Sequence, residues 1–395
     1  MPIVTWHEDA LLTMESVGAA EVLAAWKDVM HKHFDTRNIE LLMVDYRLSM
    51  LQRVTDPFSG RDERTALVPV DGSAAGRTFA SQQTSIGPPD DTGVPVRLPV
   101  TVRGDRLGVL EVWLTAPPND SDQHELRRFA TALGYALIVA SRDTDLFELA
   151  SRTQRLSLAA EMQWQLLPSR GCAGEHFILA GQLEPAYHVA GDNFDWCAAS
   201  DHLLVSVSEG MGRGTSASLL TSLAVNALRN ARRGGLDLAG QARLANEALQ
   251  AAYGGEQFVG TLLLRLDYLS GGATAVDAGS PLVIRQRGTE VEVVQLDKQL
   301  PLGMFEGTNY EEQELDVASG DRLIIVSDGV HAARSHRNEE FKEAKLERSV
   351  RATRGLPAGE VVRQFIRELH AHLEGQELSD DAVVVCLDWT GTPSP

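Results

Sequence analysis

The stretch Leu203-Leu-Val-Ser-Val-Ser-Glu-Gly-Met-Gly-Arg-Gly214 carries the clearest structural signal in this chain of 395 residues. Its first five residues predict a buried β-strand, and the acid Glu209 and three glycines that follow predict a sharp turn at the end of that strand. A helix is predicted next, from Thr215 to Arg233. A strand, glycines and a helix also form dinucleotide sites, but those sites need a second strand after the helix. Here a second predicted helix, Leu236 to Tyr253, follows instead, which excludes a dinucleotide site.

Acidic residues recur at the ends of other predicted strands, in the segments Gly191-Asp192, Ser327-Asp328-Gly329 and Ser379-Asp380-Asp381. A single Asp-Gly pair is usually an ordinary turn, so the argument depends on the order and spacing of the set. Carboxylates from several strand ends offer hard oxygen ligands, which suit Mg²⁺ or Mn²⁺ rather than zinc. Two such ions can activate water for attack on a phosphoryl group.

Short apolar runs predict further strands in this part of the chain. Hairpin signals between them, such as Ser270-Gly271-Gly272 and Arg287-Gly288, indicate antiparallel sheets with helices outside rather than repeated βαβ units. A third helix is predicted over Ala358 to Leu373. The predicted strands are Phe177 to Gln182, Leu203 to Val207, Phe258 to Asp267, Thr274 to Asp277, Val291 to Leu296, Arg322 to Val326 and Ala382 to Leu387.

Residues from about 155 to 390 contain an ordered set of motifs that resembles the SpoIIE-like branch of the metal-dependent PPM-type serine/threonine protein phosphatases. The motifs, in chain order, are Glu161-Met-Gln-Trp-Gln-Leu-Leu-Pro168, Pro185-Ala-Tyr-His-Val-Ala-Gly-Asp-Asn-Phe-Asp195, Val207-Ser-Glu-Gly-Met-Gly-Arg-Gly214, Phe258-Val259 with Thr261, Asp277-Ala-Gly-Ser-Pro281, Pro301-Leu-Gly303, Ser327-Asp-Gly-Val330 and Ser379-Asp-Asp-Ala-Val-Val-Val385. The resemblance implies an α+β fold whose C-terminal part, residues 169–395, is a PPM phosphatase αββα sandwich of antiparallel sheets flanked by helices.

The resemblance also implies a site and an activity. The carboxylates of Asp192, Glu209, Asp328 and Asp380 and the backbone carbonyl of Gly210 would be catalytic or metal-binding groups for two Mn²⁺ or Mg²⁺ ions. Asp195 and Asp381 are expected behind them. The implied reaction is hydrolysis of phosphoserine or phosphothreonine on a protein, with a STAS-type anti-anti-sigma factor as the expected substrate in bacterial stress or developmental signalling.

Three departures from the family pattern bear on this expectation. Glu209 replaces the aspartate that bridges both metals, Arg213 replaces a variable histidine, and Ser280 and His331 also differ from the usual residues. Only the first affects the mechanism, because one extra methylene moves a carboxylate by roughly an ångström, a misplacement that can cost about a hundredfold in rate. The alternative function is therefore a catalytically weak or silent phosphatase-like module that binds a regulatory partner.

The first part of the chain, from about 15 to 140, resembles a GAF sensory domain. The resemblance is carried by Val70-Asp-Gly-Ser-Ala-Ala-Gly76, Leu98-Pro-Val100 and Arg103-Gly-Asp-Arg-Leu-Gly-Val-Leu110. It implies a GAF-like sensor domain over residues 1–140 that either responds to a small-molecule or protein signal or serves only packing. Its cyclic-nucleotide signature is not found. One helix is predicted from about 8 to 34, and strands over Ile39 to Val44, Leu48 to Val54, Val94 to Val102 and Leu107 to Thr115.

A helical linker over residues 141–168 is expected between these domains. From Ser121 to Leu167 the sequence holds one Gly and no Pro, which predicts one long helix or two in sequence, capped near Asp120 or Ser121. Leu149 and Leu156 stand seven residues apart, so either a coiled-coil seam or packing against its own domain is expected. The seam motivates the expectation of a homodimer.

Composition limits the partners and the location. The net charge of −19 and the pI near 5.0 argue against nucleic-acid binding, which needs clustered Lys and Arg. No signal peptide and no apolar run long enough for a membrane are found, and the three cysteines form no CxxC pair, which argues against a disulfide framework. We therefore expect a cytoplasmic protein.

Overall fold

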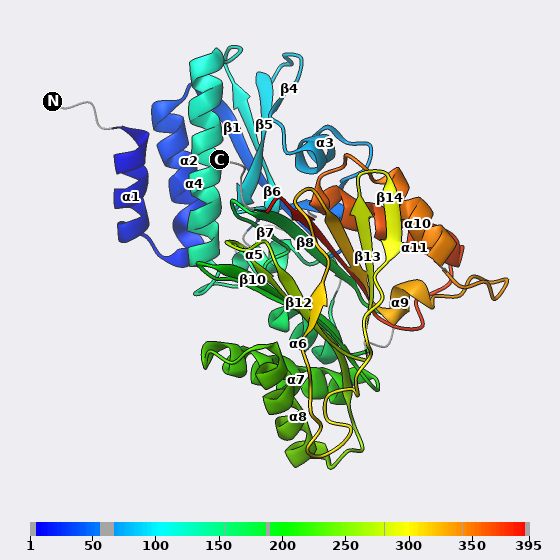
Figure 1. Ribbon diagram of the computed structural model, residues 1–395. Coiled ribbons are helices and arrows are strands. Elements are labelled where there is room, and N and C mark those ends of the chain that lie inside the picture. Colours follow the sequence, from blue (N-terminus) through cyan, green and yellow to red (C-terminus); the bar gives the residue numbers. More distant parts are fainter. Residues whose placement is uncertain are drawn as a thin grey trace. The chain divides into compact units, whose positions relative to one another are not determined.

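The computed structural model describes residues 5–55, 67–153, 155–186, 190–279, 281–341 and 343–391. The chain divides into two compact units, Met1–Arg155 and Leu156–Pro395, each with its own sheets and helices (Figure 1). No helix among the described residues is long and apolar enough to cross a membrane.

Unit 1 is a six-stranded antiparallel sheet with helices on both faces. The strand order is β3-β2-β1-β6-β5-β4, which places the first and last strands in chain order, β1 and β6, side by side at its centre. The strands are β1 (Thr36–Val44), β2 (Met50–Arg53), β3 (Leu67–Pro69), β4 (Ser85–Ile86), β5 (Val94–Val102) and β6 (Asp105–Leu114). The helices are α1 (Trp6–Ser16), α2 (Val22–His33), α3 (Ala74–Ser81), α4 (Asp120–Ala140) and α5 (Leu146–Ala150).

The alternation of side chains along β1 divides the core of unit 1 in two. Ile39, Leu41 and Met43 face a large apolar cluster formed with α1, α2 and α4, which lie together in Figure 1. Leu42 and Val44 face the smaller cluster under α3. This architecture of a sheet with helices agrees with the expected sensor-like shape, while its assignment as a GAF domain stays a prediction.

Two predicted helices are wrong in extent. The helix expected from about 8 to 34 is interrupted at Val17 and Gly18, where the backbone is extended, and a short 3₁₀ turn leads into α2. The helix expected from Ser121 to Leu167 is three helices, α4, α5 and α6 (Leu158–Leu166), and the cap of α4 is Asn119.

The interruption before α6 has a local cause and a tertiary one. Ser157 is extended and accepts a hydrogen bond from the Ala160 amide, so α6 begins there as a separate, capped helix. In α5, Phe147 and Ala150 are buried in the large core of unit 1. Of the two expectations for this segment, the structure therefore supports packing against its own unit over a free seam.

Unit 2 is built on two antiparallel sheets. The five-stranded sheet has the order β15-β12-β11-β10-β9, and the six-stranded sheet has the order β14-β13-β16-β17-β8-β7. The strands are β7 (Gly171–Ala173), β8 (Phe177–Glu184), β9 (Asp192–Ala198), β10 (His202–Gly210), β11 (Val259–Asp267), β12 (Ala273–Ala278), β13 (Leu282–Arg287), β14 (Glu290–Val293), β15 (Gln313–Leu315), β16 (Arg322–Val326) and β17 (Ala382–Trp389). The remaining helices are α7 (Gly214–Arg233), α8 (Leu238–Tyr253), α9 (Asp328–His331), α10 (Glu343–Ala352) and α11 (Ala358–Leu373).

Three apolar clusters show that unit 2 is a four-layer sandwich. One cluster lies between the sheets and includes Val205 and Val207 from one sheet and Ile325 and Val385 from the other. A second lies between the five-stranded sheet and the helices α7 and α8, and a third between the six-stranded sheet and α10 and α11. The predicted αββα sandwich of antiparallel sheets is confirmed. Strands β7, β9, β13 and β15 were absent from the prediction.

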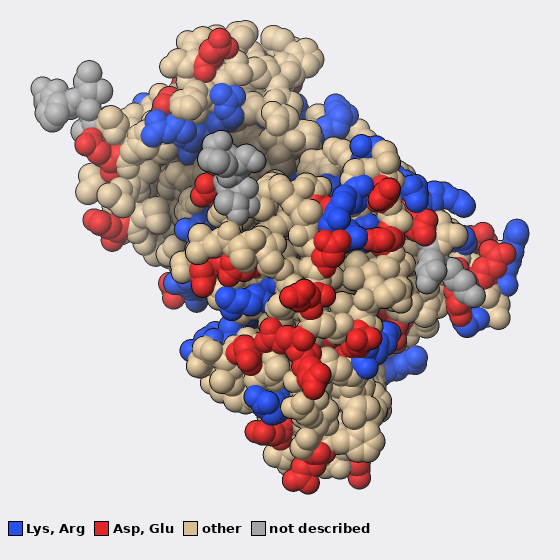
Figure 2. All heavy atoms as spheres, viewed as in Figure 1, with Lys and Arg blue, Asp and Glu red and all other residues tan. Residues whose placement is uncertain are grey.

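Figure 2 shows Asp and Glu side chains interspersed with Lys and Arg among uncharged residues on the face in view. The excess of acidic over basic residues gives the chain its net charge of −19.

Candidate metal centre and active site

The candidate site lies at one end of the sandwich of unit 2, where strands of both sheets begin or end. In the five-stranded sheet, β9 begins at Asp192 and its antiparallel neighbour β10 ends just after Glu209. In the six-stranded sheet, β16 ends just before Ser327 and Asp328, and β17 begins just after Asp380 and Asp381. Antiparallel pairing therefore brings acids from four separate segments to the same end of the sandwich.

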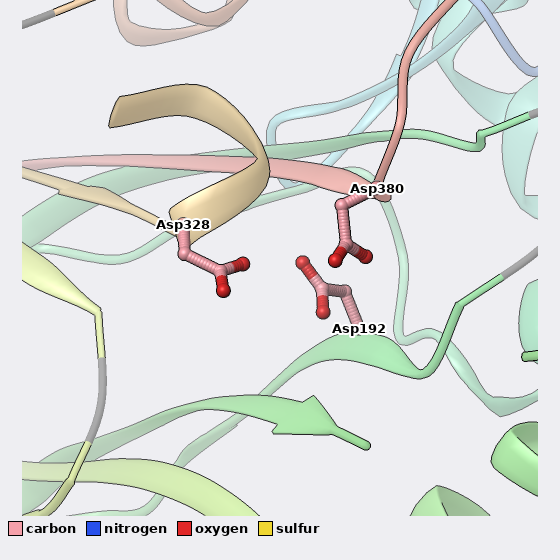
Figure 3. Close-up of side chains that lie close together, drawn as sticks. All are labelled: Asp192, Asp328 and Asp380. Atoms are coloured by element: carbon pink, nitrogen blue, oxygen red, sulfur yellow. The ribbon is translucent and has the colours of Figure 1, made fainter. Parts of the chain in front are cut away.

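Three of the predicted ligands form one cluster. Asp192, Asp328 and Asp380 each offer a carboxylate oxygen, and these oxygens all lie within 4.8 Å of one another. Figure 3 shows the three carboxylates converging from different segments of the chain. Asp192 is buried, Asp380 is half-buried and Asp328 is exposed, so the cluster opens to solvent on one side.

Glu209 stands beside the cluster with one oxygen already in use. It is the direct cross-strand partner of Asp192, so their side chains lie on the same face of the sheet. Its Oε1 accepts a hydrogen bond of 3.0 Å from the backbone amide of Asp328, which ties the end of β10 to the start of α9. The longer side chain thus reaches the start of α9.

The acids of the site raise one another's pKa. Burial, the charge of Asp328 and the charge of Asp380 raise the pKa of Glu209 to about 8, although the Asp328 amide and Lys298 oppose the shift. Burial and Asp328 raise the pKa of Asp380 to about 6. Burial, Glu209 and Asp381 raise the pKa of Asp192 well above its usual range.

A divalent cation fits this set of donors. The Oδ2 atom of Asp192 is buried and has no hydrogen-bond partner among the described residues, which is costly for a carboxylate unless a cation takes the place of water. Several carboxylate oxygens with no thiolate or imidazole among them suit Mg²⁺ or Mn²⁺.

Glycine follows two of the acids, and at Gly329 the reason is steric. A Cβ atom at this position would lie only 1.8 Å from the carbonyl oxygen of Asp381, so the start of α9 can approach the start of β17 only without a side chain. Gly210, whose carbonyl is a predicted ligand, directly follows Glu209, and its amide donates to the carbonyl of Gly191.

Two weaker candidates have other partners. Asp381 is fully buried and accepts hydrogen bonds from the side chain of Gln163 and the amide of Ala186. Asp195 forms ion pairs with Arg229 and Arg232 of α7. Asp195 therefore holds a helix against its sheet, whereas Asp381 lies close enough to Asp192 to raise its pKa.

Gln163 of α6 is a contributor whose individual role sequence reasoning missed. Its Nε2 donates to the carbonyl oxygen of Asp192 at 2.8 Å and to Oδ2 of Asp381 at 2.5 Å, and so joins the two sheets behind the cluster. Its position inside the motif from Glu161 to Pro168 was the only available signal. Tyr187, His188 and Val189 of the next motif, and Ser280, lie outside the described residues.

Comparisons with known proteins agree with this geometry. Residues 199–390 match the family model described as stage II sporulation protein E (SpoIIE), a range that contains Glu209, Asp328 and Asp380, whereas Asp192 precedes it. No curated protein matches the chain.

Solved structures are similar to part of this chain. The SiaA-PP2C domain of Pseudomonas aeruginosa is similar with a TM-score of 0.51 and 20% identity, over 58% of this chain and 94% of that chain. The PP2C phosphatase domain of the Bacillus subtilis cell fate determinant SpoIIE, with a fragment of its regulatory domain, has a TM-score of 0.49 and 20% identity, over 55% of this chain and 66% of that chain. The RsbU and RsbW domains of a Mycobacterium tuberculosis protein have a TM-score of 0.48 and 21% identity, over 55% of this chain and 61% of that chain. This chain thus spans less than two thirds of the last two structures.

Proposed function

Residues 199–390 form a phosphatase domain of the SpoIIE family, and from this premise we propose that the chain hydrolyses phosphoserine or phosphothreonine on a protein. The observation that carries the proposal is the convergence of Asp192, Asp328 and Asp380 at the open end of the sandwich. Two Mn²⁺ or Mg²⁺ ions are the proposed cofactors.

The proposed ligands are the carboxylates of Asp192, Glu209, Asp328 and Asp380 and the carbonyl of Gly210. Divalent ions held there would supply Lewis-acid stabilisation for the negative charge that develops on the phosphoryl oxygens. The buried carboxylates attract and orient the cations, and the exposed side of Asp328 leaves the substrate a path to them.

The reaction itself is a hydrolysis. Water attacks phosphorus, the bond from phosphorus to the side-chain oxygen breaks, and that oxygen takes a proton to become the serine or threonine hydroxyl while inorganic phosphate leaves. The chain's contribution is a fixed arrangement of charge at the end of two packed sheets, because preorganised groups do not have to reorient when the transition state forms.

The proposed substrate is a STAS-type anti-anti-sigma protein. It rests on the family resemblance of the motifs between residues 155 and 390. A signal received by the GAF-like unit and a homodimer complete the proposal. The burial of Phe147 and Ala150 in unit 1 removes part of the linker from the surface that a dimer could use.

The test is hydrolysis of p-nitrophenyl phosphate and of a phosphorylated STAS protein, with Mn²⁺ and with EDTA. We expect Mn²⁺-dependent release of phosphate that is lost in Asp380→Asn. The matched control is Asp201→Asn, since Asp201 precedes β10 at the strand end away from Glu209. A folded, Mn²⁺-loaded wild-type chain that hydrolyses neither substrate would favour the silent binding module, for which the bond from Glu209 to the Asp328 amide is the supporting observation.

A further inference from the structure

Arg213 extends from the turn that joins β10 to α7, close to the carboxylate cluster. It is the residue before the first turn of α7, and its backbone is extended, with φ −148°. Gly212 and Gly214 on either side have φ values of +97° and +67°, which side-chain-bearing residues rarely adopt. The turn therefore has the backbone that only these flanking glycines readily allow, and it carries a single long cationic side chain.

The guanidinium of Arg213 reaches the edge of the metal centre. Its Nη2 donates to the carbonyl oxygen of Ser379 at 3.3 Å, and Ser379 directly precedes the proposed ligand Asp380. Burial and the charge of Asp328 raise the pKa of Asp380, and the charge of Arg213 opposes that shift. The contact and the charge effect both place the guanidinium beside Asp380.

Most of the donor capacity of Arg213 is uncommitted. A guanidinium has five N–H donors, and the Ser379 carbonyl is one acceptor. Among the described residues no carboxylate forms an ion pair with Arg213, and the residue is exposed. Arg229 and Arg232 on the same helix differ, since both are held by Asp195.

We propose that Arg213 binds the phosphoryl group of the substrate, as a phosphate-binding residue that this chain has in place of the family's variable histidine. The inference rests on the proposed function and names the group that recognises the phosphate ester. The planar fork of a guanidinium matches two phosphate oxygens, which a lysine ammonium does not.

Electrostatics explain why such a group is needed. Asp192, Glu209, Asp328 and Asp380 surround the site with negative charge, and the chain as a whole carries −19. A phosphate ester is itself an anion, so bound cations and a nearby guanidinium must together offset this repulsion. Arg213 supplies a fixed positive charge on the side of Asp380.

The experiment compares the Mn²⁺-loaded full chain with Arg213→Met and Arg213→Lys. For Arg213→Met we expect kcat/KM for p-nitrophenyl phosphate to fall about 10- to 100-fold and inhibition by inorganic phosphate to weaken similarly, as for the loss of hydrogen bonds to a charged group. Arg213→Lys should recover part of the loss. Arg233→Met is the matched control, because Arg233 is an exposed arginine at the other end of α7, about 30 Å away.

Mn²⁺ affinity, measured by calorimetry, separates phosphate binding from a structural role. Removing a positive charge beside Asp380 should leave Mn²⁺ binding unchanged or tighter, whereas a damaged site would lose Mn²⁺ and phosphate together. Unchanged phosphate inhibition in Arg213→Met, or joint loss of Mn²⁺ and phosphate, would overturn the inference.

A last arm separates this inference from the proposed function. If the wild-type chain hydrolyses neither substrate, calorimetry with inorganic phosphate on the Mn²⁺-loaded chain still tests whether Arg213 binds phosphate. Phosphate binding that disappears in Arg213→Met would support the role of Arg213 in a silent domain. Absence of phosphate binding in the wild type would refute it.

Discussion

Each unit of the chain places two acidic residues directly opposite each other on neighbouring antiparallel strands. In unit 1 the pair is Glu40 on β1 and Glu111 on β6, and in unit 2 it is Asp192 on β9 and Glu209 on β10. Like charges in such positions repel and destabilise a sheet. The two units deal with this repulsion in different ways.

In unit 1 each acid has its own arginine. Arg53 lies 2.7 Å from Glu40, and Arg97 lies 2.6 Å from Glu111, with which it is also paired across the strands. The result is a row across four strands in which the two central acids are flanked by an arginine on each side. Each acid in this row already has a basic partner, so its charge is balanced without a bound ligand.

In unit 2 no arginine or lysine among the described residues forms an ion pair with Asp192 or Glu209. The charges of further acids act on both carboxylates, and the pKa of Glu209 is raised to about 8 although Lys298 opposes the shift. Repulsion among these acids therefore destabilises unit 2, and a bound divalent cation would remove that repulsion. The comparison favours the proposal that the paired acids of unit 1 serve the fold, whereas the unpaired acids of unit 2 bind a cation.

The largest expected effect comes from removing a proposed ligand. Asp328→Asn should lower hydrolysis by more than about a hundredfold, because even changes to groups that only support metal ligands cost 10- to 100-fold. Mn²⁺ binding, measured by calorimetry, should weaken in parallel. The same change in unit 1, Glu111→Gln, should affect neither, and unaltered Mn²⁺ binding in Asp328→Asn would show that the cluster is not the metal site.

Metal and pH should act on the stability of unit 2 alone. Mn²⁺ at a hundred times its Kd should stabilise this unit by about 2.7 kcal/mol, and EDTA should reverse the shift in its calorimetric transition. Without metal, the transition should move to lower temperature as pH rises from about 5 to 9. The reason is that the folded-state pKa values of Asp380 and Glu209 are raised to about 6 and about 8. As pH rises towards those values, the unfolded chain releases its protons before the folded unit does. The free energy of unfolding therefore falls through this pH window and stays low above it.

A substitution of one acid in the site tests the same prediction. Asp192→Asn removes one of the repelling charges, so it should stabilise metal-free unit 2 at pH 8 and abolish the response to Mn²⁺. A metal-free unit whose stability rises with pH would contradict the assignment of raised pKa values to these carboxylates.

The acids of the site could be predicted from the sequence because each stands in a local pattern. An apolar strand, an acid and a glycine occur together around Glu209 and Asp328, and antiparallel pairing is enough to bring strand ends together. The sandwich itself follows from the same runs, since alternate residues face the core between the sheets. The features that could be predicted, the strand-end acids and the sandwich, are thus those that depend on residues close together in the sequence.

Contacts between distant residues could not be predicted. Asp195 stands in the same motif as the proposed ligand Asp192, but its partners, Arg229 and Arg232, stand 34 and 37 residues away. Gln163 meets Asp381 across 218 residues. The break between α5 and α6 depends on the burial of Phe147 in unit 1, which helical periodicity does not reveal.

A smaller effect is expected when the charge row of unit 1 is broken. Arg97→Met leaves Glu111 facing Glu40 without its partner, and the Arg97 and Glu111 side chains are only 17% and 13% exposed. We expect unit 1 to lose about 1–3 kcal/mol of unfolding free energy, the cost of an unsatisfied polar group. Adding Glu111→Leu should recover most of it, because removal of both partners leaves no unpaired charge. Equal stability of Arg97→Met and the wild type by calorimetry would mean that the row is too hydrated to matter.

The smallest effect expected is also the one that bears most directly on activity, the replacement of Glu209 by aspartate. Glu209 uses its extra methylene to reach the amide of Asp328, so one of its oxygens is engaged at the start of α9. Glu209→Asp keeps the charge, shortens the reach and frees the carboxylate for the proposed metals. We expect hydrolysis to rise about tenfold, which corresponds to about 1.4 kcal/mol of barrier. The gain should be larger with Mg²⁺ than with Mn²⁺, since Mg²⁺ demands more regular octahedral geometry.

Steady-state rates of hydrolysis with each metal, measured for Glu209→Asp beside the control Glu40→Asp in unit 1, test this prediction. A loss of activity in Glu209→Asp would mean that the bond to the Asp328 amide is needed to hold α9 in place, and that this pocket is built around glutamate.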